Sequence, residues 1–174
     1  GIIHVCLNGD IDNYRDLKVE YEANYDKIHD EINTDTKLIP LQIEHYLKQG
    51  NTIYEAFRLA LNDFEGSHAI SMHSDLAPGK LFLAQKGSGQ TIFVGLAGDH
   101  YIAASEIYGI VEETRDFIKL NGEGKGQIVI LDRNSNGGVS GIKSYYYDGT
   151  NIPIEDQNVR TSDITSRDID RQHF

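Results

Sequence analysis

The chain has 174 residues, enough for one domain with its own hydrophobic core. Its formal net charge of −11 opposes contact with a phosphate backbone, so we expect no nucleic-acid partner. We also expect a cytoplasmic protein with no membrane partner, because no apolar run could span a bilayer, no signal-peptide pattern is visible and a single cysteine cannot form an intramolecular disulfide.

The first predicted element is a strand over residues 2–7, which are mostly aliphatic. We expect it to stop in a tight turn at Asn8 and Gly9, a pair that tolerates positive φ. Backbone N–H groups at the tip of such a strand can stabilise an oxyanion. Taken alone, however, the dipeptide is an ordinary turn signal.

Three helices are expected next. The first is capped by Asp12 or Asn13, and the second starts at Asn33 or Thr34 and ends near Gly50. Between them, residues 26–32 are interpreted as a short polar edge strand. The third helix opens with a capping box of the Thr-x-x-Glu type, and its apolar residues recur with a helical period: Ile53, Phe57, Ala60, Leu61 and Phe64.

The rest of the sequence has the period of strands. Residues 67–73, 81–85, 91–96 and 101–104 predict an antiparallel meander, because their connections are too short for parallel crossovers. Residues 81–84 and 92–94 are apolar at every position, which indicates that both sheet faces are covered. The expected fold class is therefore α+β, a layered sandwich of helices and antiparallel sheets. A helix starting at residue 105 is expected, followed by strands over 117–120, 127–131 and 142–147.

The single cysteine, Cys6, is interpreted as a buried apolar thiol. His4 lies on the same strand face, but two ligands are too few for a metal site, so we predict neither a metal nor a cofactor. The other candidate histidines are expected to be surface residues or satisfied core residues: His29, His45, His68, His73 and His100.

A set of short motifs occurs in a familiar order. They are Leu7-Asn8-Gly9-Asp10, Thr34-Asp35-Thr36, Phe64-Glu65-Gly66-Ser67-His68, Gly87-Ser88-Gly89, Gly95-Leu96-Ala97-Gly98 and Ala103-Ala104-Ser105-Glu106. With this order, residues 2–132 resemble the class II glutamine amidotransferase domain with an N-terminal nucleophile, most closely that of the glutamine–fructose-6-phosphate aminotransferases. The resemblance implies a four-layer α-β-β-α sandwich. It also implies a partial amidotransferase domain over residues 1–148 and a polar linker over 149–174 toward a sugar-isomerase domain.

In that family an N-terminal cysteine attacks the side-chain amide of L-glutamine, and the ammonia released is passed to an acceptor. The resemblance implies that Asn8 and Gly9 form the oxyanion hole of this acyl transfer and that Gly9 also contacts the substrate. It further implies that Asp35 binds the α-ammonium group of glutamine, for which a carboxylate is a strong partner. The implied product is ammonia for amino-sugar phosphate synthesis.

The sequence departs from the family in two places. Leu7 stands where the family usually has His, and the sequence starts at Gly1 without the N-terminal cysteine. Cys6 cannot replace that nucleophile, because it lies inside a strand and has no free α-amino group. We therefore expect this chain alone to be inactive. The alternatives are a non-catalytic regulatory or interaction module of the same fold, and a related synthetase for asparagine or a purine precursor. A homodimer is a further expected assembly.

Overall fold

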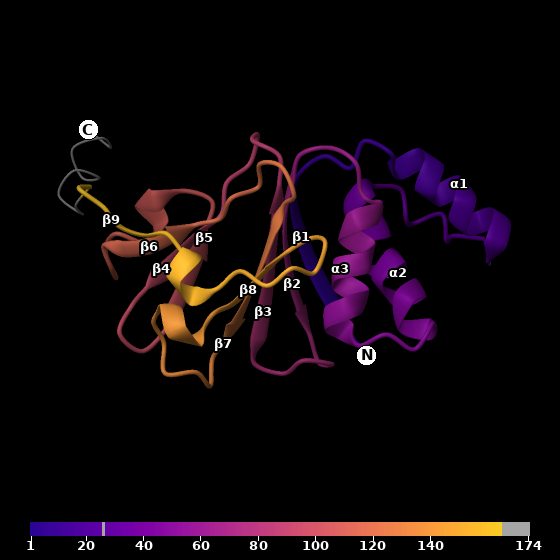
Figure 1. Ribbon diagram of the computed structural model, residues 1–174. Helices are drawn as coiled ribbons and strands as arrows, with labels where there is room; N and C mark the ends of the chain where they lie inside the picture. The colour runs from indigo at the N-terminus through magenta and orange to yellow at the C-terminus, as the bar shows by residue number, and fades with distance from the viewer. Residues whose placement is uncertain (26, 165–174) are drawn as a thin grey trace.

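The computed structural model describes residues 1–25 and 27–164, which form three α-helices and two antiparallel sheets (Figure 1). The helices are α1 (Tyr14–Asn24), α2 (Asp35–Lys48) and α3 (Ile53–Asp63). None of the helices in this described part of the chain is long and apolar enough to cross a membrane.

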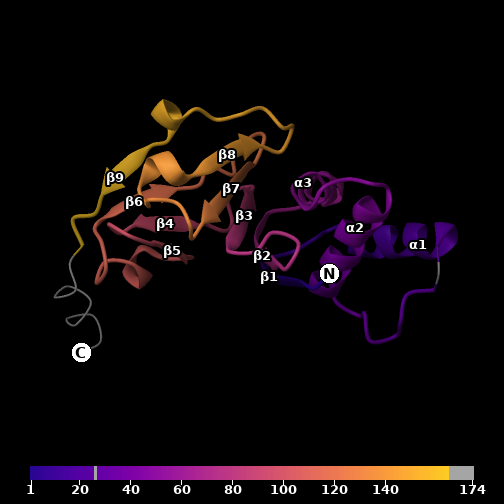
Figure 2. The ribbon, with the colours of Figure 1, turned by 90° about the horizontal axis from the view of Figure 1, so that it is seen from below.

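The two sheets lie face to face, and the helices cover the outer side of the larger one (Figure 2). The five-stranded sheet has, in spatial order, β1 (Ile3–Gly9), β2 (His68–Ser74), β3 (Lys80–Lys86), β7 (Gln127–Asp132) and β8 (Lys143–Tyr146). The four-stranded sheet has β5 (Tyr101–Ala104), β4 (Phe93–Leu96), β6 (Asp116–Lys119) and β9 (Val159–Thr161). The predicted α+β sandwich of antiparallel sheets is confirmed.

The larger core lies between the helices and the five-stranded sheet. Phe57 of α3 is fully buried there and meets Phe82 of β3 edge to face, with 5.4 Å between ring centroids. The helix begins as predicted, because the Thr52 hydroxyl accepts the backbone N–H of Glu55 at 3.2 Å. The reciprocal half of the capping box is replaced, since the Glu55 carboxylate pairs with Arg58.

A second core lies between the two sheets, and the continuous apolar strands supply both cores. Along β3, Phe82 and Ala84 face the helices while Leu83 faces the four-stranded sheet. There Leu83 joins Val94 of β4 and Ile118 of β6 in one buried cluster. Alternate residues of one strand thus pack on two different layers, which explains why residues 81–84 are apolar at every position.

The expected single meander is wrong, because its four strands belong to two sheets. Strands β2 and β3 pair in one sheet, β4 and β5 pair in the other, and residues 87–92 cross between the sheets. Strand periodicity reports that a segment is extended and buried. It carries no signal for which sheet the next strand joins.

Two further expectations are corrected. Among the described residues 27–34 there is no strand; a turn closes there with the Ile32 N–H donating to the His29 carbonyl at 2.8 Å. The helix expected from residue 105 is reduced to a single 3₁₀ turn, η1 (Ile107–Gly109). The segment that follows covers the outer side of β4, where Ile110 is fully buried against Gly95.

The chain beyond Asp148 returns to the fold. Ile152 donates its N–H to the Ser144 carbonyl at 2.9 Å, and β9 pairs with β6. Residues up to 164 therefore have a defined place on the two sheets. The domain boundary at 148 and the linker role of 149–174 remain predictions, and the last part of this predicted linker, residues 165–174, lies outside the described residues.

Candidate active site

Strand β1 continues through both residues that were expected to form a turn. Asn8 is paired with Ala69 and Gly9 with His68, so they are the last two residues of the strand. Gly9 has a φ of +106°, as its position before a change of direction requires. A Cβ atom at Gly9 would lie 2.4 Å from the Ser67 carbonyl oxygen, so a side chain is excluded by space as well as by φ.

The loop after Gly9 is fixed by backbone contacts to the loop between α3 and β2. Asp12 donates its N–H to the Glu65 carbonyl at 2.8 Å. The Asn13 side chain accepts the N–H of Glu65 at 3.0 Å and donates to the Asp63 carbonyl at 2.8 Å. Asn13 therefore joins two loops instead of hydrogen-bonding within its own helix. These hydrogen bonds hold the end of β1 in place.

Asp35 lies next to this loop. It is the first residue of α2 and is half-buried. One of its carboxylate oxygens accepts the N–H of Ile11 at 3.2 Å, and the other accepts the N–H of Thr36 at 2.8 Å. The structure thus places Asp35 beside the segment that directly follows Gly9. Each carboxylate oxygen keeps a further lone pair for another donor.

Asn8 opens onto an apolar groove of about 310 Å³ between the sheets. The groove is lined by residues of β1 and of both sheets, including Asn8, Cys6, Ala69, Leu83, Ile92 and Ala103. Cys6 is exposed there, so the expectation of a buried thiol is wrong. Exposure alternates along β1, and the face that carries Cys6 and Asn8 is the one turned away from the helices.

Gln90 is a site neighbour that the sequence reasoning missed. A Cβ atom at Gly9 would lie 2.9 Å from the side-chain amide carbon of Gln90. The Gln90 Oε1 atom is buried and has no hydrogen-bond partner among the described residues. The only sequence signal was the adjacent Gly87-Ser88-Gly89 run, which marks a close approach of backbones but does not single out the residue after it.

His68, the strand partner of Gly9, is fully buried, and its Nε2 atom lies 2.8 Å from the Tyr147 hydroxyl. Burial, and to a smaller extent the positive charge of Lys86, lowers the pKa of His68 from 6.5 to about 4. The imidazole is therefore neutral at physiological pH. It lies in the core as expected, but its Nδ1 atom has no hydrogen-bond partner among the described residues, so His68 is not a fully satisfied core histidine.

Asn8, Gly9 and Asp35 lie at one end of β1, and the two sides of this end differ in their chemistry. The Asn8 side chain is an exposed amide donor beside an apolar groove, which suits an oxygen atom that gains negative charge. The Asp35 carboxylate lies across the loop and suits a cationic group. The catalytic and substrate-binding roles of Asn8, Gly9 and Asp35 remain predictions.

No family model matches the chain, but individual proteins do. It is 36% identical over 132 residues to the glutamine–fructose-6-phosphate aminotransferase (isomerizing) of Methanothermobacter thermautotrophicus, a match covering 76% of this chain and 21% of that protein. The enzyme of the same name from Clostridium tetani is 30% identical over 155 residues, covering 89% of this chain and 23% of the relative. The chain thus spans about a fifth of the length of these curated relatives.

Among solved structures, a glutamine phosphoribosylpyrophosphate amidotransferase from B. subtilis, complexed with ADP and GMP, has the same fold. The TM-score is 0.64 at 20% identity, and the match covers 83% of this chain and 29% of that one. At this identity the likeness concerns the fold alone.

Proposed function

We propose that this chain, a homologue of part of the glutamine–fructose-6-phosphate aminotransferases with the fold of the N-terminal-nucleophile amidotransferases, is the glutaminase unit of a larger enzyme. It binds L-glutamine and hydrolyses the side-chain amide, and the ammonia serves amino-sugar phosphate synthesis in an associated sugar-isomerase domain. The observation that carries the proposal is the meeting of Asp35 with the loop that leaves Gly9. Two motifs that are 26 residues apart in the chain are thereby joined at one strand end.

The proposed roles follow from this placement. The Asn8 side-chain amide and the Gly9 backbone N–H donate to the oxyanion that forms when the glutamine amide is attacked. Asp35 binds the α-ammonium of the substrate through the lone pairs that its two backbone hydrogen bonds leave free. The groove beside Asn8 accommodates the aliphatic part of the substrate.

The attacking group is not supplied by the part of the site described above. The only cysteine among residues 1–174 is Cys6, inside β1 and without a free α-amino group. The proposed reaction needs an activated thiolate close to Asn8. We therefore expect residues 1–174 alone to release no ammonia from glutamine. N-terminal sequencing of the protein isolated from its source tests whether a cysteine-led segment stands before Gly1.

The decisive experiment is a glutaminase assay on the full-length protein with Asp35→Asn. This variant keeps an acceptor for the N–H of Ile11, loses the acceptor for the N–H of Thr36 and removes the charge for the ammonium. We expect kcat/KM for glutamine to fall by about 100-fold or more, as for loss of a charged hydrogen bond in a desolvated site. Asp30→Asn, at an exposed position, is the matched control and should leave kcat/KM unchanged. Full activity in Asp35→Asn would overturn the assignment.

A non-catalytic module of the same fold is the second candidate, favoured by the position of Cys6 as the only thiol in residues 1–174. An intact protein that binds glutamine without releasing ammonia would support it. The cytoplasmic location and the homodimer remain predictions; fractionation of source cells and sedimentation of the purified protein would test them.

A further inference from the structure

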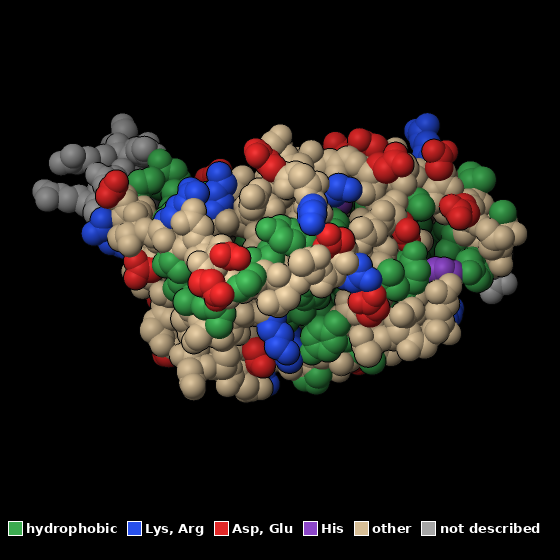
Figure 3. Space-filling model, in the orientation of Figure 1, with side chains coloured by type: hydrophobic (Ala, Val, Ile, Leu, Met, Phe, Trp, Pro, Cys, Tyr) green, Lys and Arg blue, Asp and Glu red, His purple; other side chains and the backbone are tan. Residues whose placement is uncertain are grey.

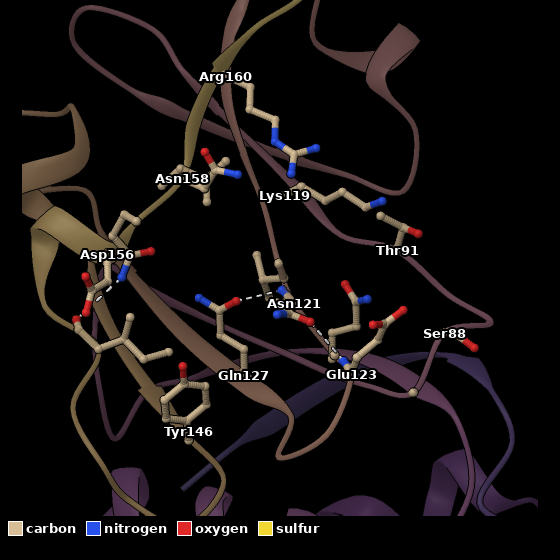
Figure 4. Close-up of a pocket in the computed structure, with 17 residues that line it drawn as sticks. Ser88, Thr91, Lys119, Asn121, Glu123, Gln127, Tyr146, Asp156, Asn158 and Arg160 are labelled. Carbon is tan, nitrogen blue, oxygen red and sulfur yellow. Dashed lines mark hydrogen bonds between the residues drawn. The ribbon is translucent and has the colours of Figure 1, made fainter.

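A second hollow, of about 390 Å³, lies at the same end of the five-stranded sheet but over β3, β7 and β8 (Figure 4). Its volume is in the range of small-molecule sites. Asn8, Gly9 and Asp35 are not among its lining residues, so it is separate from the proposed glutaminase site. Its lining is mostly polar, unlike that of the groove beside Asn8.

The floor of this hollow is held in place by buried amides. Gln127 is 5% exposed, accepts the N–H of Asn121 at 2.7 Å and donates to the Ser144 hydroxyl at 2.8 Å. Gln85 is 4% exposed and accepts the N–H of Ile92 at 2.8 Å. Both side chains link neighbouring segments of backbone. The hollow therefore has a preorganised shape, so little protein entropy is lost when a ligand binds.

Two cations face the hollow from neighbouring strands. Lys119 lies at the end of β6 and Arg160 on β9, and their side chains extend toward the same side of the opening (Figure 4). Basic side chains gather over these strands on the face drawn in Figure 3. Neither cation forms an ion pair within residues 1–25 and 27–164, although the chain has 27 acidic residues against 16 basic ones.

The remaining groups suit hydroxyls. Asn121 offers both donors and acceptors, Asn158 offers its side-chain N–H groups, and Thr91 offers a hydroxyl. Two carboxylates, Glu123 and Asp156, also line the hollow and can accept hydrogen bonds from hydroxyl groups. The hollow has cations at one side and neutral or acidic acceptors elsewhere. This arrangement is complementary to a ligand with one anionic end and a hydroxylated body.

We propose that this hollow binds a small hydroxylated phosphate monoester, with the phosphate between Lys119 and Arg160. The Asn158 side-chain oxygen accepts hydrogen bonds from Arg160 Nε at 3.1 Å and Nη2 at 3.0 Å, which holds the guanidinium in place. The remaining N–H groups of Arg160 can donate to phosphate oxygens, and the ammonium of Lys119 adds a point charge. The hydroxyl groups of the ligand contact Asn121, the side-chain N–H groups of Asn158 and the carboxylates. The site goes beyond the proposed glutaminase chemistry and does not depend on it.

The test is a titration of the 174-residue chain with glucose 6-phosphate. Isothermal titration calorimetry measures the affinity, and amide NMR shifts locate the site. We expect saturable binding, with shifts at residues 119–123 and 158–160. The double variant Lys119→Gln, Arg160→Gln should weaken the affinity by about tenfold or more, because it removes both charged contacts. Lys48→Gln makes the same kind of charge change at the exposed end of α2 and should leave the affinity unchanged.

Two further ligands separate the contribution of the phosphate from that of the hydroxyl groups. Glucose should bind at least about tenfold more weakly, because it lacks the phosphate, and inorganic phosphate should compete with glucose 6-phosphate. Thermal unfolding checks that the double variant is folded, which its exposed positions favour. The proposal is overturned if glucose 6-phosphate gives no saturable signal up to about 10 mM, or if the double variant binds it as well as Lys48→Gln does.

Discussion

The two faces of β1 have opposite surroundings. On one face, Ile3, Val5 and Leu7 pack on the core formed with α2 and α3. On the other face, Cys6 and Asn8 are exposed in the groove between the sheets. A strand alternates its side chains, so one stretch of chain can contribute to the core with every second residue and present functional groups with the others. The proposed site is therefore rigid on one side and open on the other.

The contrast predicts that the largest loss of stability follows a substitution in the core between the helices and the five-stranded sheet. Phe57→Ala removes a fully buried ring that contacts Phe82, and it should lower the free energy of unfolding by about 4 kcal/mol. Urea unfolding followed by circular dichroism measures it. Val19→Ala on the exposed side of α1 is the control and should change the value by less than about 0.5 kcal/mol. A loss below about 1 kcal/mol for Phe57→Ala would show that the helices contribute little to stability.

The second effect concerns the end of the sheet beside Gly9, where His68 is buried. Its pKa is about 4 in the folded chain, against 6.5 for an ordinary histidine. Between these values the unfolded chain binds the extra proton, so stability is fully present above pH 6.5 and decreases as the pH falls to 4. The loss from this residue should be about 3 kcal/mol.

Unfolding at several pH values, compared between the wild type and His68→Gln, isolates this contribution from that of the carboxylates. The variant should lose less stability on acidification, because glutamine does not titrate. His73→Gln makes the same substitution at an exposed position of the same strand and is the matched control. If the free energy of unfolding fell equally with pH in the wild type and in His68→Gln, the interpretation of His68 as a buried neutral imidazole would be wrong.

The smallest effect is expected on the open face of β1. Cys6→Ala should change the free energy of unfolding by less than about 0.5 kcal/mol, because the thiol is exposed. The Cys6 thiol of the folded wild type should also react with an aromatic disulfide reagent within about tenfold of its rate in urea. A thiol that is protected in the folded chain would mean that something covers the groove, and the contrast between the two faces would fail.

Much of the local structure was predictable, because it depends on local chemistry. The helical period from Ile53 and the Thr52 cap predicted α3, and the strand period predicted β3 and β7 within one or two residues. The exposure of Cys6 was not predictable in this way. It depends on whether another layer covers the second face of β1, which is a tertiary property.

The candidate site was predictable only through the resemblance. Asn8 with Gly9 is a common dipeptide, and only the order of motifs joined it to Asp35, which the structure places beside the following loop. Gln90 could not be predicted as a site residue, because an isolated polar residue in a loop has no periodicity. Its position against Gly9 results from the crossing of the chain between sheets, which the meander interpretation did not include.

Three glycines connect the polar hollow to the end of β1 through close contacts with Gly87 and Ser67. A methyl group at Gly122 would meet the Gly87 carbonyl oxygen at 2.6 Å, one at Gly87 would meet the Ser67 hydroxyl at 2.1 Å, and one at Gly9 would meet the Ser67 carbonyl oxygen at 2.4 Å. Gly87 and Gly122 line the polar hollow, while Gly9 ends β1. A side chain at Gly87 or Gly122, in the wall of the polar hollow, would therefore press on the segment around Ser67 that contacts Gly9, so changes in this wall reach the strand end that carries the proposed glutaminase residues.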